Sequence, residues 1–133
     1  MYVLCVKRNQ GFWEFPKGHK ENEETDYEAA FRELKEETSL QVKALMTKQS
    51  FTNNYEFFRN GTKILKTVHY FIALTEGDVK LQPEEISDSA WCDIDEAIAL
   101  LTFENSKQLC HRIKKWILNS DNPYLFIERK DHA

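Results

Sequence analysis

Two runs of β-branched and aromatic residues meet at Asn60-Gly61, and this junction constrains the fold more than any other feature of the sequence. The runs lie within the segment NYEFFRNGTKILKTVHYFIAL and are rich in residues that favour extended backbone. Asn-Gly readily adopts the positive φ angles of a two-residue turn, which makes it the strongest short hairpin signal. The sequence therefore predicts two antiparallel strands joined at this turn.

Shorter strand-like segments lie on both sides of the hairpin. YVLCVKR (2–8) is rich in β-branched and aromatic residues, and FWEF (12–15) indicates a short extended piece. LQVKALM (40–46) alternates apolar and polar residues, and SAWCDI (89–94) indicates a further short strand. These segments predict a sheet of several short strands.

Two capping-box patterns predict where helices begin. Thr25 with Glu28, and Asp93 with Glu96, have the spacing at which two side chains satisfy backbone donors at a helix start. The face that we expect the first helix to bury consists of Tyr27, Ala30, Phe31, Leu34 and Thr38. An amphipathic C-terminal helix is indicated by Leu109, Ile113, Trp116 and Ile117. Because strands and helices do not alternate regularly, we expect one α+β domain over residues 1–133, with helices on a mixed or antiparallel sheet.

Composition narrows the class of protein and its partners. Apolar residues make up 41% of the 133 residues and charged residues 30%, which is typical of a globular protein with a real core. The net charge of −4 gives no overall attraction to nucleic acid or membranes. No apolar run approaches the ~18 residues that span a bilayer. With no visible signal peptide, and with Cys5, Cys92 and Cys110 far apart and odd in number, we expect buried thiols in a cytoplasmic protein.

Three carboxylates crowd the end of the first predicted helix. Glu33, Glu36 and Glu37 are three and four residues apart, so like charges share a surface near the negative end of the helix dipole. An ordinary solvated acidic face is one interpretation. A metal site is the other, because small hard cations prefer carboxylate oxygens. The metal-site interpretation is favoured by three residues that precede the cluster in the sequence: Gly18, Glu24 and Arg32.

This pattern, from Gly18 through Glu24 to the run RELKEE at 32–37, resembles the Nudix box. The resemblance implies an α/β/α sandwich with a loop–helix–loop site for Mg²⁺, with Mn²⁺ as a substitute. It implies that Glu33, Glu36 and Glu37 are metal ligands, that Arg32 holds them by ion pairing, and that Glu37 assists the attacking water, with Glu36 beside it in the catalytic core. Glu24 would support the loop.

Two departures from the family pattern concern the geometry. Ser39 replaces the usual glycine after the box, where a left-handed backbone would cost a serine ~1 kcal/mol. Family members usually have a strand before the segment at 2–8. The resemblance therefore implies either a sheet without that strand or a shortened chain.

The segment GFWEFPKGHKE resembles the diadenosine tetraphosphate hydrolase branch of the family. In that branch Lys17, Gly18 and His19 would bind the phosphate chain. VHYFIAL and LLTFENSKQL resemble segments in which aromatics lie near adenine, here Tyr70 and Phe103, and QPEEISDSAWCDIDEA resembles a loop that adds a fourth metal carboxylate, here Glu85. The alternative for these residues is an ordinary surface or core position.

We therefore predict a hydrolase that splits a dinucleoside polyphosphate, foremost diadenosine tetraphosphate to ATP and AMP, by metal-assisted attack of water. Its partner would be this small nucleotide, without a membrane, and the protein would be a monomer or weak dimer. One alternative is an RNA 5′-pyrophosphohydrolase, which would bind a capped or triphosphorylated RNA end. Others are a diphosphoinositol polyphosphate phosphohydrolase and a non-catalytic nucleotide-binding module on the same scaffold.

Overall fold

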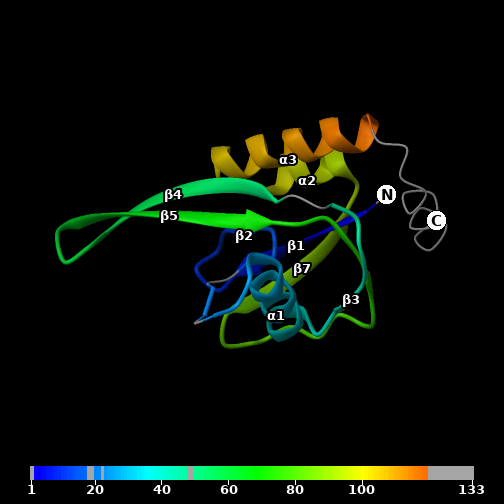
Figure 1. Cartoon of the computed structure of the whole chain (residues 1–133), viewed down its shortest axis with the longest axis horizontal. Coiled ribbons are helices and arrows are strands. Elements are labelled where there is room, and N and C mark those ends of the chain that lie inside the picture. The colour runs from blue at the N-terminus through cyan, green and yellow to red at the C-terminus, as the bar shows by residue number, and fades with distance from the viewer. Residues whose placement is uncertain (1, 18–19, 22, 48–49, 120–133) are drawn as a thin grey trace.

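The N-terminal strand is the centre of a three-stranded antiparallel sheet. The computed structural model describes residues 2–17, 20–21, 23–47 and 50–119 (Figure 1). Strand β1 (Val3–Arg8) pairs with β2 (Trp13–Glu14) on one side and with β7 (Ile86–Cys92) on the other. The register with β7 shifts between Lys7 and Arg8. Such an irregularity re-aims side chains locally, and here it lies where Arg8 enters the candidate site.

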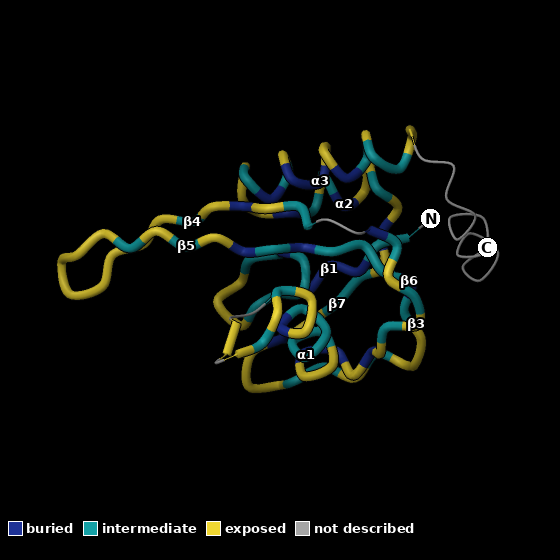
Figure 2. Tube along the Cα trace, viewed as in Figure 1, coloured by how far each residue is buried: buried dark blue, intermediate teal, exposed yellow. Residues whose placement is uncertain are grey.

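Two further antiparallel pairs complete the strands. Strand β3 (Gln41–Leu45) pairs with β6 (Ala73–Glu76), and β4 (Phe51–Arg59) pairs with β5 (Thr62–Tyr70). The turn between β4 and β5 has positive φ at Asn60 (53°) and Gly61 (78°), so the predicted hairpin is confirmed. Its far end extends beyond the rest of the molecule in Figure 1, and Figure 2 shows that end exposed.

Three helices cover the strands, and both predicted capping boxes are present. Helix α1 (Asp26–Thr38) begins after Thr25, which exchanges hydrogen bonds with Glu28. Helix α2 (Ile94–Leu100) begins after Asp93 in the same way, and α3 is Glu104–Leu118. Helices α2 and α3 lie on one side of the strands and α1 on the other (Figure 1). The predicted α+β fold and α/β/α sandwich are thus confirmed.

Apolar side chains gather in three clusters between these layers. One joins β1 and β7 to the two C-terminal helices and contains the thiols of Cys5, Cys92 and Cys110, which are buried and free. A second lies between β1, Leu40 and Ile86, and a third between β5 and α3. None of the helices in the described part of the chain is long and apolar enough to cross a membrane.

The buried side of α1 differs from the prediction at two positions. Tyr27 is 45% exposed, where its ring contacts Phe31 and Phe71, so placing it in the buried face was wrong. Glu37 was not part of the predicted buried face, but it is fully buried, beside the buried Thr38. The Glu37 carboxylate can point inward because Arg8 of β1 pairs with it there. Helical periodicity could not predict this, because it contains no information about residues outside the helix.

Candidate functional site

The last turns of α1 carry the three glutamates in different environments. Glu33 and Glu37 are one turn apart and share a side of the helix, and Glu36 lies next to them. The exposed fraction of the side chain is 0% for Glu37, 15% for Glu33 and 49% for Glu36. The cluster therefore runs from the protein interior to solvent within one helical turn.

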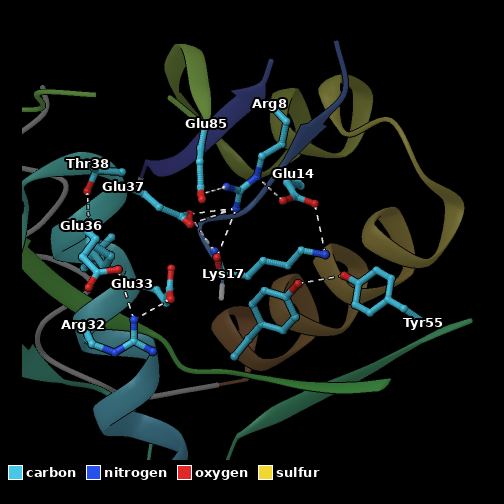
Figure 3. A network of polar contacts seen from close by, with 12 residues as sticks. Arg8, Glu14, Lys17, Arg32, Glu33, Glu36, Glu37, Thr38, Tyr55 and Glu85 are labelled. Carbon is cyan, nitrogen blue, oxygen red and sulfur yellow. Dashed lines mark hydrogen bonds and ion pairs between the residues drawn. The ribbon is translucent and has the colours of Figure 1, made fainter. Parts of the chain in front are cut away.

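Arg32 joins the outer part of this cluster to the loop before the helix. Its guanidinium donates to both carboxylate oxygens of Glu24, at 2.8 and 3.1 Å. It also donates to Glu33 at 2.7 Å and to Glu36 at 3.2 Å (Figure 3). Glu24 in turn accepts a 2.8 Å hydrogen bond from the amide of Glu21. The Arg32 guanidinium thus links the loop at Glu24 to the helix and contacts both Glu33 and Glu36.

Arg8 provides the partner of the buried glutamate. One of its terminal nitrogens, Nη2, lies 2.9 and 3.0 Å from the two carboxylate oxygens of Glu37, and the amide of Lys17 donates to the same group at 3.3 Å. Burial raises the pKa of Glu37 to about 7, against the opposing effect of Arg8. Burial also raises the pKa of Glu33, assisted by the nearby carboxylates of Glu36 and Glu85, while Arg32 opposes the shift. The cluster is electrostatically unfavourable, and added positive charge would relieve it.

A loop brings Glu85 to the same place. The last carbonyls of α1, on Glu37 and Thr38, accept hydrogen bonds from the amides of Gln82 and Lys80. These bonds satisfy groups that a helix end leaves unpaired, and they anchor the loop that ends in β7. The Glu85 carboxylate, more than half exposed, then lies 3.4 Å from Arg8.

Lys17 connects the carboxylates to an aromatic surface. Its ammonium group lies 3.3 Å from Glu14 and 3.8 Å from the centre of the Tyr55 ring, an arrangement in which the ring face attracts the cation. The Tyr55 hydroxyl is 2.8 Å from that of the buried Tyr70. Lys66 stands directly opposite Tyr55 across the hairpin, and burial together with Lys17 lowers its pKa.

A pocket of about 450 Å³ opens beside these residues, between α1 and β5. Lys17, Lys66 and Tyr70 are among its lining residues, together with Phe15 and apolar side chains of α1. The three box glutamates do not line it, so Lys17 is the link between pocket and carboxylates. Phe103 is not among the lining residues either. Its ring, 43% exposed, packs on Phe12 at 5.1 Å between centroids.

Most of the residues that the sequence singled out thus lie together. Arg32, Glu33, Glu36, Glu37, Glu85 and Lys17 form one group of two polar networks, which Figure 3 shows. Arg32 contacts Glu33 and Glu36, whereas Arg8 contacts Glu37, Glu85 and Glu14, and Glu14 also contacts Lys17. Tyr70 contacts this group through the hydroxyl of Tyr55, and Phe103 contacts a different loop. Gly18 and His19 lie outside the described residues.

Sequence reasoning missed four members of this group: Arg8, Glu14, Tyr55 and Lys66. The only local signal was Glu14, an acidic residue between aromatic neighbours in a strand. It is 2% exposed and accepts a 2.5 Å hydrogen bond from Arg8. A charged side chain flanked by Trp13 and Phe15 in a buried strand needs a counterion, but the sequence does not say which residue supplies it.

The carboxylate oxygens near the end of α1 are of the chemical type that a hard divalent cation prefers. Four carboxylates surround the end of α1, and Mg²⁺ prefers such oxygens while keeping several waters. Within the described ranges no three acidic, histidine or cysteine side chains are grouped as a ready ligand set. The reason is visible in Figure 3: Glu37 faces Arg8, whereas Glu33 and Glu36 face Arg32. An ion would therefore compete with these arginines for carboxylate oxygens, most directly at Glu37, where Arg8 contacts both oxygens.

Known proteins resemble this chain in sequence and fold. The sequence profile of the NUDIX domain family matches residues 2–112. MutT4 of Mycobacterium tuberculosis, named as a mutator protein, is 31% identical over 120 residues, which cover 88% of this chain but only 48% of that protein, so this chain spans about half of that relative. The asymmetrical bis(5′-nucleosyl)-tetraphosphatase of Rattus norvegicus is 34% identical over 108 residues, 78% of this chain and 72% of that enzyme.

Solved structures give the same picture. A Caenorhabditis elegans Ap4A hydrolase in a binary complex superposes with a TM-score of 0.71 at 23% identity, covering 90% of this chain and 88% of that one. A MutT protein from Bacillus halodurans gives a TM-score of 0.65 at 30% identity, covering 91% and 76%. These four proteins carry names of two kinds: MutT or mutator proteins, and hydrolases of Ap4A or of bis(5′-nucleosyl) tetraphosphates.

Proposed function

The chain belongs to the NUDIX domain family, and on that premise we propose that it hydrolyses a phosphoanhydride of a dinucleoside polyphosphate, foremost diadenosine tetraphosphate, to ATP and AMP. The observation that carries the choice of substrate is the position of Lys17. It borders both the carboxylate cluster and an aromatic pocket, and Lys66 lies across Tyr55 from it. A chain of several phosphates ending in a base needs cations beside an aromatic surface.

Within this proposal the glutamates have separate roles. Glu33, Glu36, Glu37 and Glu85 would hold Mg²⁺, and Mn²⁺ would substitute for it. Such an ion, when bound, neutralises phosphate oxygens and makes the phosphorus more electrophilic. Glu37 would accept the proton of the attacking water. Burial raises the pKa of Glu37, against the opposing effect of Arg8, and a carboxylate in a desolvated position is a stronger base than a solvated one.

The remaining polar residues would position these groups and the substrate. Arg32 keeps Glu33 and Glu36 on the same side of the helix through its contacts at 2.7 and 3.2 Å. Lys17 would bind phosphate oxygens with its ammonium group, which Glu14 and Tyr55 hold at the mouth of the pocket. In this proposal Gly18 and His19, next to Lys17 in the chain, also contact the phosphates, and Tyr70 and Phe103 lie near the bases.

The test is a panel of substrates with product identification in ¹⁸O-labelled water. We expect diadenosine tetraphosphate to be cleaved with the highest kcat/KM and to yield ATP and AMP, with ¹⁸O in one of them, which identifies the phosphorus attacked. Nucleoside triphosphates belong in the panel because of the MutT relatives. A 5′-triphosphorylated RNA and a diphosphoinositol phosphate complete it. A higher kcat/KM on any of these would replace the proposed substrate.

A binding module without catalysis is the rival of another class. It predicts tight nucleotide binding by calorimetry with no product under saturating Mg²⁺ or Mn²⁺. The grouped carboxylates argue against it, because a protein that only binds a polyanion gains nothing from four negative groups beside the pocket.

A further inference from the structure

The guanidinium of Arg8 contacts more carboxylates than it can neutralise. Its Nε donates to Glu14 at 2.5 Å, Nη2 to both oxygens of Glu37 at 2.9 and 3.0 Å, and Nη1 to Glu85 at 3.4 Å. The Arg8 side chain is 11% exposed and that of Glu37 fully buried. Glu37 and Glu85 come from segments far apart in the chain and meet at this one cation (Figure 3).

Glu14 holds Arg8 independently of the other two carboxylates. Its side chain is 3% exposed, with one oxygen on Nε of Arg8 and the other 3.3 Å from Lys17. Nη2 also donates to the carbonyl of Lys17 at 3.2 Å. Loss of the contacts to Glu37 and Glu85 would therefore leave the guanidinium attached to Glu14 and the Lys17 loop.

We propose that Arg8 is a stand-in cation: in the metal-free protein it occupies the oxygens of Glu37 and Glu85 that a divalent ion takes when it binds. The inference rests on the metal site of the proposed function. The physical reason is geometric: Nη2 of Arg8 lies 2.9 and 3.0 Å from the two oxygens of Glu37, on the side of the carboxylate where a divalent ion that chelates both oxygens would lie, and two cations that close repel each other strongly. Arg8 thus pairs a buried Glu37 that would otherwise destabilise the fold strongly, and an ion that binds both oxygens of Glu37 displaces Arg8 from it.

Displacement has a consequence for the substrate. The N–H groups that leave Glu37 become donors without a carboxylate partner, on a side chain that Glu14 still positions beside Lys17. A guanidinium fork is well suited to phosphate oxygens. Metal binding would then create a phosphate donor, so metal affinity and polyphosphate affinity would be coupled, each raising the other equally.

The direct test follows the arginine side-chain resonances by ¹⁵N NMR during a Mg²⁺ titration. We expect the Arg8 Nε–H signal to persist, because Glu14 still accepts from it, whereas the Arg8 Nη signals change as Nη2 leaves Glu37. Arg59, at the exposed end of the hairpin, serves as the control that should not respond. The assignment comes from the spectrum of Arg8→Lys.

A second measurement uses that variant for metal affinity. Lysine keeps the positive charge, but its single ammonium group replaces the several donors of the guanidinium. A lysine at position 8 should therefore compete less well than arginine with a metal ion for Glu37. We expect Arg8→Lys to bind Mn²⁺, measured by the loss of the free Mn²⁺ EPR signal, about fivefold more tightly than the parent protein, or about 1 kcal/mol. Arg59→Lys should leave the Mn²⁺ dissociation constant unchanged.

The outcomes separate this inference from the proposed function. Mg²⁺ binding with unchanged Arg8 Nη signals, or Mn²⁺ binding in Arg8→Lys that is equal or weaker, overturns the stand-in role while leaving the hydrolase proposal intact. No metal binding at all in the parent protein overturns both. Changed Nη signals together with tighter Mn²⁺ binding support the stand-in role even if the preferred substrate differs from the one proposed.

Discussion

At the scale of single residues, the candidate site is built around a carboxylate that is fully buried. Glu37 has no exposed side-chain surface and is neutralised by Arg8 and the Lys17 amide. Glu36, one residue earlier, is half exposed and shares Arg32 with Glu33. Adjacent glutamates thus have different partners, and substitutions at the two positions should have different effects on stability.

Replacing the two glutamates by glutamine tests their roles. We expect Glu37→Gln and Glu36→Gln to remain folded and to lower kcat by at least about a hundredfold, because each loses a negatively charged ligand and Glu37 also loses its role as base. Steady-state kinetics on diadenosine tetraphosphate, with circular dichroism for folding, measure this. Glu56→Gln, on the exposed hairpin beside Lys63, is the control for loss of a charge. Near-normal turnover in both site variants would show that the metal site is elsewhere.

The backbone conformation of Ser39 predicts how substitutions at this position affect the stability of the fold. It ends α1 with a left-handed backbone, φ 67°, and its hydroxyl donates to the carbonyl of Lys80 at 3.0 Å. The conformation expected to strain a serine at this position is therefore present. Ser39→Gly and Ser39→Ala both lose the hydroxyl, but only glycine relieves the strain.

We expect Ser39→Gly to be more stable than Ser39→Ala by about 1 kcal/mol in urea unfolding. Comparing the two variants with each other removes the contribution of the hydroxyl. Equal stabilities would mean that the helix end relaxes out of the left-handed region.

At the scale of elements, α1 is the part of the fold that sets the site in place. Its start is fixed by Thr25 and Glu28, which exchange hydrogen bonds of 3.3 and 3.0 Å. Its end is fixed by loop amides that bind the last carbonyls. The cap also fixes the helical phase, and with it the direction in which Glu33 and Glu37 point.

Removal of the cap should weaken the helix start without removing any ligand. We expect Thr25→Ala to lower the free energy of unfolding by about 1 kcal/mol, measured by urea denaturation. Asp93→Ala makes the matched change at the start of α2. The two variants should lose similar stability, whereas only Thr25→Ala should also alter Mg²⁺ affinity. If Asp93→Ala changed Mg²⁺ affinity equally, the effect would be global and not one of helix α1.

At the scale of the whole molecule, the candidate pocket lies where β5 of the hairpin meets α1 and the Lys17 loop. Lys66 comes from β5, Lys17 from the loop after β2, and both line the pocket. The two ammonium groups repel each other, and this repulsion helps to lower the pKa of Lys66. A polyanion between them would relieve the repulsion.

Lys66→Met should therefore raise KM for diadenosine tetraphosphate about tenfold, the effect of one lost charge-assisted hydrogen bond, with little change in kcat. Initial rates over a range of substrate concentrations measure both constants. Lys63→Met removes a lysine of the same strand that pairs with Glu56 at the exposed end of the hairpin, and it should leave KM unchanged. A fall in kcat without a rise in KM would place Lys66 at the reacting phosphate.

Local chemistry made much of this protein predictable. The hairpin follows from the positive φ of Asn60 and Gly61, and the starts of α1 and α2 follow from capping residues three positions apart. The grouping of Glu33, Glu36 and Glu37 follows from helical spacing alone. In each case the interacting groups are at most four residues apart, so the chain specifies them before it folds.

Tertiary structure alone decided which charges are paired. Arg8 meets Glu37 across 29 residues of sequence and Glu85 across 77, and no local rule links such positions. The same holds for Tyr27, which helical periodicity placed in the core and the structure leaves 45% exposed. The sequence by itself determined the elements and the acidic helix end, because short-range hydrogen bonds and spacing control them. Which cation the buried Glu37 faces was settled only when β1 packed beside the end of α1, because a desolvated carboxylate needs a counterion and Arg8 is distant from it in sequence.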